Sequence, residues 1–222
     1  MKLFLDSAFE NEIPIMADRG ILDGITTNPS LIAKTSGSDY IQVVSGIARK
    51  IEEWKLNVPL SIEIFESDFS KMTEQAKEFI QQINYENLNI KVPIGWDELS
   101  VIKSLKNEGI RVNTTCIFSL SQAHLALDAE SDFISIFFCR LEDSGGNPEE
   151  VCYELRNIIE KTNSKSEIIA GSIRTPLDVE KALISGAHIC TTALNVYEKS
   201  SKHVLTTQSV DGFMKDFESW IK

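Results

Sequence analysis

The feature that most constrains the fold is a regular alternation of short β-branched or aromatic runs with amphipathic segments. Runs of strand type begin roughly every 20–35 residues, which is the length of one βα unit. We predict strands at 2–6, 24–27, 60–65, 88–92, 111–117, 132–138, 167–171 and 188–192. The chain therefore reads as an α/β protein built from a series of βα units.

Helix signals lie between the strand runs. Ser7 is expected to cap a helix that runs to about Asp18. Helix starts of N-cap, proline or capping-box type are NPSL (28–31), SLSQ (119–122), NPEE (147–150) and TPLD (175–178). Apolar residues at helical spacing predict helices over 40–54, 69–82, 96–107, 149–161 and 175–185, and a C-terminal helix over about 209–221.

This pattern predicts a single domain over residues 1–222, a (β/α)8 TIM barrel with an additional C-terminal helix. No linker or low-complexity tract divides the chain. Its 222 residues make a compact barrel, since the typical one has about 250. The competing fold is an open doubly wound sheet. No strand run is followed by a glycine-rich nucleotide-binding motif, and eight units favour closure.

Composition excludes several classes of partner. The net charge of −11 argues against nucleic acid and anionic membranes, and no apolar run approaches the ~20 residues of a membrane span. The N-terminus does not read as a signal peptide, because Asp6 and Glu10 interrupt it. The four cysteines have no C-x-x-C spacing and the histidines are scattered. We expect a cytoplasmic protein with free thiols, no metal site and no cofactor.

Polar residues of the predicted strands gather at one end of the predicted barrel. Lys91 lies between Ile90 and Val92, so it is expected to face the interior; taken alone, it could equally stand in water at a strand end. Catalytic groups of such barrels gather at the carboxyl ends of the strands. The other candidates there are Asp6, Thr26, Thr27, Asn28, Glu63, Asn113, Thr115, Arg140, Ser172 and Arg174, with Arg140 expected at the end of the sixth strand.

Each candidate also has a structural interpretation. Asn28 could simply cap a helix, and Asp6 and Glu63 could be exposed carboxylates. Arg140 and Arg174 could form surface ion pairs, which are common and weak. Their coincidence at one end of a single barrel favours a common site.

The chemistry that these groups could share begins with an enclosed lysine. Desolvation favours the uncharged amine, which can attack a carbonyl carbon. The resulting iminium accepts electrons from a neighbouring carbon–carbon bond. Asp6 could take the proton from the hydroxyl of the leaving carbon, while Glu63 and Thr115 could serve the proton transfers of imine formation and hydrolysis.

The two remaining cationic candidates, Arg140 and Arg174, could bind a phosphate group. Arg140, Arg174 and Ser172 make a sensible phosphate clamp, because arginine forms bidentate, charge-assisted hydrogen bonds to phosphate oxygens. Such barrels often bind phosphate near strands 7 and 8. The predicted substrates are therefore phosphorylated carbonyl compounds.

The successive motifs resemble the small transaldolases related to fructose-6-phosphate aldolase. The motifs are LFLDSA, GITTNPSLIAK, SIEI, NIKVP, NEGIRVNTTCIFSLSQA, FCRLED and AGSIRTP, in order from residue 2 to about 190. The resemblance implies a class I, Schiff-base barrel without a cofactor. It transfers a dihydroxyacetone unit between sugar phosphates, in the pentose phosphate pathway, and usually forms pentamers or decamers.

The resemblance also implies a role for individual residues. Lys91 would form the Schiff base, Asp6 would act at the cleaved bond, and Glu63 and Thr115 would position the catalytic water. The sugar would contact Thr26, Asn28, Asn113, Ser135 and Phe137, and the phosphate would contact Arg140, Ser172 and Arg174.

Two positions separate the branches of this family. Members that release free dihydroxyacetone carry glutamine at the position of Glu63 and tyrosine at that of Phe137, whereas transaldolases carry the residues found here. We therefore expect a transaldolase, with fructose-6-phosphate aldolase as the alternative. The chain departs from the family at Ile136, where proline is usual, and over 190–200.

Two functions from other classes are alternatives. A sugar-phosphate-binding barrel without activity would not need Lys91, Asp6 and Glu63 together. A lysine-dependent aldolase of the deoxyribose-phosphate type lacks the TTNPS motif (26–30).

The C-terminal helix has two possible positions. Its apolar stripe, Phe213, Phe217 and Trp220, fits packing on a neighbouring copy in a homo-oligomer. Packing on its own barrel is the alternative.

Overall fold

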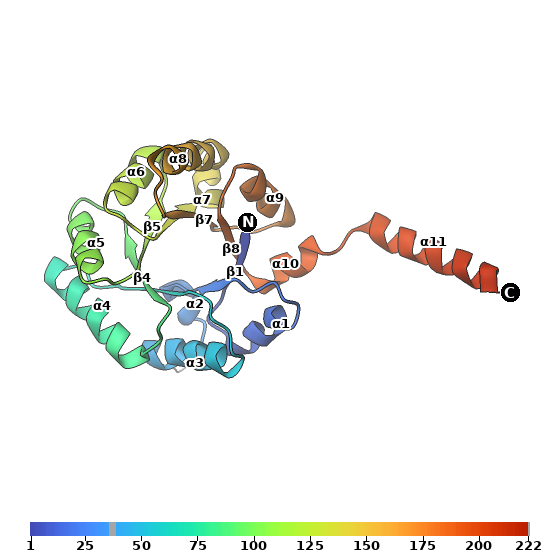
Figure 1. Cartoon of the computed structure of the whole chain (residues 1–222), viewed down its shortest axis with the longest axis horizontal. Coiled ribbons are helices and arrows are strands. Elements are labelled where there is room, and N and C mark those ends of the chain that lie inside the picture. The colour runs from blue at the N-terminus through green and yellow to red at the C-terminus, as the bar shows by residue number, and fades with distance from the viewer. Residues whose placement is uncertain (36–38, 222) are drawn as a thin grey trace.

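The chain forms a closed barrel of eight parallel strands, in a computed structural model that describes residues 1–35 and 39–221 (Figure 1). Each strand pairs with the next in sequence, and β8 pairs with β1 to close the barrel. The strands are β1 (Lys2–Asp6), β2 (Gly24–Thr26), β3 (Leu60–Glu63), β4 (Leu88–Pro93), β5 (Val112–Ile117), β6 (Phe133–Phe137), β7 (Glu167–Gly171) and β8 (Ile189–Thr192). The predicted (β/α)8 barrel is confirmed, and the open doubly wound sheet is excluded.

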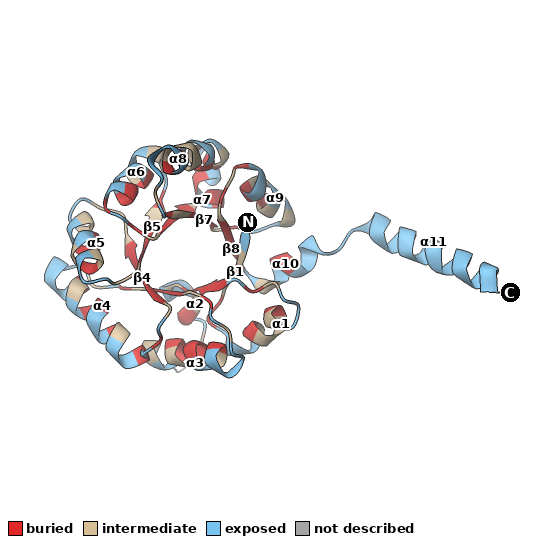
Figure 2. Ribbon diagram, in the orientation of Figure 1, coloured by how far each residue is buried: buried red, intermediate tan, exposed pale blue. Residues whose placement is uncertain are grey.

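Helices connect the strands and cover the outside of the barrel. They are η1 (Glu10–Glu12), α1 (Ile13–Ala17), α2 (Pro29–Ile32), α3 (Tyr40–Glu53), α4 (Phe69–Ile83), α5 (Glu98–Asn107), α6 (Leu120–Asp128), α7 (Phe138–Asp143), α8 (Pro148–Thr162), α9 (Pro176–Ile184), α10 (Leu194–Ser200) and α11 (Val204–Ile221). Figure 2 shows buried residues along the strands and on the helices packed around them. The main core therefore lies between the sheet and its helices.

Local capping explains where several helices begin. Asn28 accepts a hydrogen bond from the Leu31 N–H at the start of α2, and Thr175 forms a capping box at the start of α9. The Ser7 prediction was wrong, because α1 begins at Ile13 and the Ser7 hydroxyl instead donates to the Glu12 carboxylate and accepts from the Phe9 N–H. Pro14 lies in the first turn of α1, and proline is tolerated only there, so α1 begins at Ile13.

Apolar side chains of β1, β6, β7 and β8 fill part of the barrel interior. Phe4, Phe133, Ile169 and Ile189 form a buried cluster, in which the two phenyl rings meet edge to face with centroids 6.0 Å apart. The Arg111 guanidinium lies 5.6 Å from the centre of the Phe133 ring. This layer closes the barrel beneath the polar groups described below.

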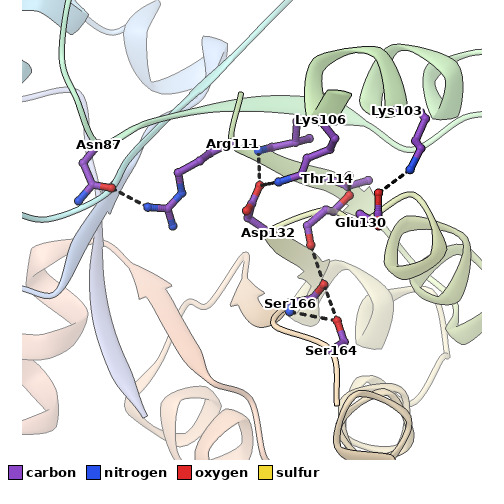
Figure 3. A network of polar contacts seen from close by, with 11 residues as sticks. Asn87, Lys103, Lys106, Arg111, Thr114, Glu130, Asp132, Ser164 and Ser166 are labelled. Atoms are coloured by element: carbon purple, nitrogen blue, oxygen red, sulfur yellow. Dashed lines mark hydrogen bonds and ion pairs between the residues drawn. The ribbon is translucent and has the colours of Figure 1, made fainter. Parts of the chain in front are cut away.

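Polar contacts link the amino-terminal ends of β4, β5, β6 and β7 (Figure 3). The Asp132 carboxylate accepts from Lys106 Nζ at 2.6 Å and from the Val112 N–H at 2.7 Å. Arg111 Nη1 donates to Asn87 Oδ1 at 2.7 Å. Because these groups satisfy one another at the amino-terminal ends of the strands, we assign the network a structural role.

The last helix differs from the others. None of the described residues of α11 is buried, and the helix extends away from the barrel (Figure 1). It begins at Val204, earlier than the expected 209, and it does not pack on its own barrel. Among the described helices, none combines the length and the hydropathy required to cross a membrane.

Candidate active site

A cavity of about 260 Å³ opens at the carboxyl ends of the strands. Polar side chains from separate strands line it, as expected of this end of the barrel. The predicted residues that line it are Asp6, Thr26, Asn28, Glu63, Lys91, Thr115, Ser135, Phe137, Arg140 and Ser172. Of the predicted candidates, Thr27, Asn113 and Arg174 are not in the lining.

Lys91 is enclosed at the base of this cavity. The residue is 5% exposed, and its Nζ lies 2.9 Å from Glu63 Oε2 and donates to the Thr27 carbonyl at 2.9 Å. Its neighbours Ile90 and Val92 are fully buried under the helices. A buried ammonium needs such partners, and the Glu63 carboxylate is placed to take a proton from the amine.

Asp6 ends β1 and lines the same cavity as the lysine. Thr26 Oγ1 donates to Asp6 Oδ1 at 2.8 Å, and the same hydroxyl lies 2.6 Å from Thr191 Oγ1. Burial raises the pKa of Asp6 above its ordinary value, while the Lys91 charge and the Thr26 hydrogen bond oppose that rise. A carboxylate whose proton affinity is raised is suited to take a proton from a substrate hydroxyl.

Strands β5 and β6 provide three hydroxyl and amide groups. The Thr115 hydroxyl is buried and has no hydrogen-bond partner within the described residues, so it is free to bond a molecule in the cavity. Asn113 lies beneath the lining, where it donates to Ser61 Oγ and accepts from Ser135 Oγ at 2.7 Å. Asn113 therefore holds Ser135, and its own contact with substrate stays a prediction.

The two predicted phosphate-binding arginines occupy different positions. Arg140 lines the cavity with its guanidinium 4.8 Å from the centre of the Phe137 ring, but it lies in α7. Its expected position at the end of the sixth strand was wrong, since β6 ends at Phe137. Arg174 is half exposed and pairs with Asp143 at 2.7 Å, outside the lining.

Sequence reasoning missed five residues of the lining. They are Pro29, Ser30, Cys116, Gly171 and Thr191. The sequence offered a signal for Thr191, because it lies in the last predicted strand. Cys116 had none: it has a left-handed backbone, φ +60°, at the irregular pairing of β5 with β6. Ser172 has the same left-handed φ on the other side of the cavity.

The cysteines are free, as predicted. One group that could hold a metal ion joins Cys139, Glu142 and Asp178, whose ligand atoms lie within 4.8 Å of one another. The Asp178 carboxylate already accepts from the backbone and hydroxyl of Thr175, and Glu142 pairs with Lys181. The Asp178 and Glu142 carboxylates are thus engaged in capping and pairing, and none of the three residues lines the cavity.

Comparison with known proteins agrees with this geometry. The chain matches the family described as transaldolase/fructose-6-phosphate aldolase over residues 3–221. It is 38% identical over 218 residues to a "Probable transaldolase" of Clostridium botulinum, covering 98% of this chain and 97% of that protein. Proteins of the same name from Coprothermobacter proteolyticus and Alkaliphilus metalliredigens are 39% and 38% identical, with at least 96% of each chain covered. The chain belongs to the transaldolase/fructose-6-phosphate aldolase family.

Proposed function

We propose that this protein is a transaldolase that transfers a dihydroxyacetone unit between sugar phosphates through a Schiff base on Lys91. The reaction is sedoheptulose 7-phosphate + glyceraldehyde 3-phosphate = erythrose 4-phosphate + fructose 6-phosphate. The observation that carries the proposal is the enclosed Lys91 amine, 2.9 Å from Glu63 and in the same cavity as Asp6. Family membership supports the general activity.

The first half of the reaction would form the Schiff base and break the carbon–carbon bond. Glu63 would take a proton from Lys91, and the free amine would attack the ketose carbonyl and lose water as the iminium forms. Asp6 would then remove the proton of the C4 hydroxyl. The electrons of the C3–C4 bond would pass to the iminium, so the aldehyde leaves and an enamine remains on Lys91.

The second half would run the same steps in reverse with a different aldehyde. The enamine carbon would attack the carbonyl of the acceptor, and Asp6 would return its proton to the new hydroxyl. Water held by Glu63 and Thr115 would then hydrolyse the Schiff base and free Lys91. No proton or electron is gained or lost over the cycle, and the Lys91 iminium would itself accept the electrons of the broken bond, so the proposed steps call for no cofactor.

The choice of transfer over release would depend on the fate of the enamine. Phe137 lines the cavity and has no hydroxyl to protonate the enamine carbon. It meets Phe118 edge to face, with ring centroids 5.6 Å apart. An apolar wall at this point would keep the enamine until an acceptor arrives.

The phosphate would lie at the mouth of the cavity. Arg140 and Ser172 line the cavity, and a guanidinium and a hydroxyl are ordinary phosphate partners. Arg174 would join them only by leaving its ion pair with Asp143. We therefore assign Arg140 the larger share of phosphate binding.

The test is to supply fructose 6-phosphate with and without erythrose 4-phosphate and to identify the products by mass spectrometry. Sedoheptulose 7-phosphate and glyceraldehyde 3-phosphate formed rapidly only with the acceptor would establish a transaldolase. Comparable release of free dihydroxyacetone without an acceptor would establish the aldolase instead. Borohydride reduction during turnover should attach the three-carbon unit to Lys91.

We also propose that the chain forms a homo-oligomer, a pentamer or decamer, in the cytoplasm. Exposed apolar side chains recur along α11, and Trp220 is 79% exposed. Most of the stability of a helix in a protein comes from the packing of its apolar face, and none of the described residues of α11 is buried, so a neighbouring copy is the expected partner. Free thiols fit a reducing compartment.

A further inference from the structure

Tyr40, the first residue of α3, holds the backbone of Glu63. Its hydroxyl donates to the Glu63 carbonyl at 2.7 Å and accepts from the Glu63 N–H at 3.1 Å. One side-chain group thus satisfies both backbone polar groups of a single residue. That residue carries the carboxylate that faces Lys91.

The need for this contact follows from the end of the β2–β3 ladder. Along the ladder, the Thr27 N–H donates to the Ser61 carbonyl. In a parallel pair the next bond would run from the N–H of residue 29 to the Glu63 carbonyl. Residue 29 is proline and has no N–H, so the hydroxyl of Tyr40 takes the place of the missing donor.

The second contact of the hydroxyl leaves an acceptor free for the lysine. In a continued ladder, the Thr27 carbonyl would accept the Glu63 N–H. Here that carbonyl accepts from Lys91 Nζ at 2.9 Å, and Tyr40 accepts the Glu63 N–H instead. The lysine can therefore bond both the Thr27 carbonyl and the Glu63 carboxylate.

Tyr40 is itself held rigidly. Its ring stacks on Phe79 with centroids 5.1 Å apart and meets Phe65 edge to face at 5.3 Å. Asp39 caps α3 through the Ile41 N–H. Burial raises the pKa of the Tyr40 hydroxyl above its ordinary value, so the group keeps the proton that it donates.

We infer that Tyr40 is a positioning residue, which orients Glu63 toward Lys91 without touching the substrate. Tyr40 is not in the lining of the cavity, so its effect must pass through the backbone of Glu63. The inference rests on the proposed function, in which Glu63 transfers protons during Schiff-base formation and hydrolysis. Loss of the hydroxyl should slow these steps and leave sugar binding almost unchanged.

The experiment compares Tyr40→Phe with Tyr85→Phe on the wild-type and Glu63→Gln backgrounds. Both substitutions remove one phenolic hydroxyl and keep the ring. Tyr85 is a matched control, because its hydroxyl bonds the Val58 carbonyl just before β3, at the opposite end of the barrel. The measurements are kcat and KM for transfer from fructose 6-phosphate to erythrose 4-phosphate, and the rate of borohydride trapping on Lys91.

A positioning role predicts a loss of kcat that depends on Glu63. Tyr40→Phe should lower kcat and the trapping rate about ten- to hundredfold, with KM changed by less than about twofold. Tyr85→Phe should leave both constants unchanged. On the Glu63→Gln background, Tyr40→Phe should cause almost no further loss, because the two residues act as a unit.

Three results would overturn the inference. They are an equal loss from Tyr40→Phe on both backgrounds, a loss confined to KM, and an equal loss of kcat in Tyr85→Phe. A wild-type protein that is not trapped by borohydride would instead refute the Schiff-base function. In that case hydrogen exchange tests the contact between the Tyr40 hydroxyl and the Glu63 backbone separately. Faster exchange of the Glu63 amide in Tyr40→Phe would support this contact, and unchanged exchange would refute it.

Discussion

The ion pair between Lys91 and Glu63 permits a quantitative prediction. The substitution Lys91→Met keeps most of the side-chain length and removes the charge. It leaves the Glu63 carboxylate and the Thr27 carbonyl without the donor that now lies 2.9 Å from each. The variant should lose both turnover and stability.

The loss of stability can be estimated from the burial of the pair. Removing one partner of a buried ion pair costs about 3–5 kcal/mol. The Glu63 side chain is 14% exposed, so water in the open cavity recovers part of that cost, and the ammonium no longer has to be desolvated. We expect a net loss of about 1–3 kcal/mol in the free energy of unfolding. For a chain of this size, each kcal/mol lowers the melting temperature by about 2–4 °C.

Thermal unfolding near pH 8 is the assay, at one fixed protein concentration because oligomerisation makes the melting temperature concentration-dependent. Lys91→Met should melt about 2–12 °C below the wild type. The double variant Lys91→Met/Glu63→Gln removes the unpaired carboxylate and should recover most of the loss. A single variant as stable as the wild type, or a double variant less stable than the single, would refute the reasoning.

Three further predictions concern Asp6, the arginines and α11. Asp6→Asn should abolish carbon–carbon cleavage and raise the melting temperature at about pH 7. Burial raises the pKa of Asp6 above 3.8, so the contribution of this side chain to the free energy of unfolding is favourable and complete below that value. It is lost as pH rises through the folded pKa. Melting curves at about pH 3 should therefore show no gain for Asp6→Asn. Arg140→Ala should raise KM for fructose 6-phosphate about ten- to hundredfold, since charged hydrogen bonds contribute about 1.5–3 kcal/mol; an equal effect of Arg174→Ala in steady-state kinetics would contradict their placement. A chain ending at residue 203 should keep the circular dichroism of the barrel but sediment as a smaller particle, and an unchanged mass would exclude α11 from the assembly.

The barrel could be predicted from the sequence, because the signals for its strands and helices are local. Period-two runs and helical periodicity are written along neighbouring residues, and N-caps such as Asn28 and Thr175 bond within their own first turn. Strand alternation also predicted that Lys91 faces inward, since Ile90 and Val92 must be buried under the helices. The same rule predicted that Asp6, Thr26, Glu63 and Thr115 lie in the lining, whereas Ser135 and Phe137 were expected only from the family resemblance.

Contacts between side chains that are distant in sequence became known only from the folded structure. Arg140 and Arg174 are both arginines near the same end of the barrel, but of these two only Arg174 forms an ion pair with Asp143. Asn113 alternates inward as expected, yet Ser135 covers it from the next strand. Strand periodicity ends where the chain turns, so it could not show that Arg140 lies in a helix.

Neither the contact of Tyr40 with Glu63 nor the position of α11 could be predicted from local sequence patterns. Twenty-three residues separate Tyr40 from the backbone that it bonds, and no spacing rule connects them. The apolar stripe of α11 predicted that the helix needs a partner, but periodicity cannot say which surface provides one. A sequence specifies which groups must be buried or bonded; only the folded chain brings together the groups that satisfy them.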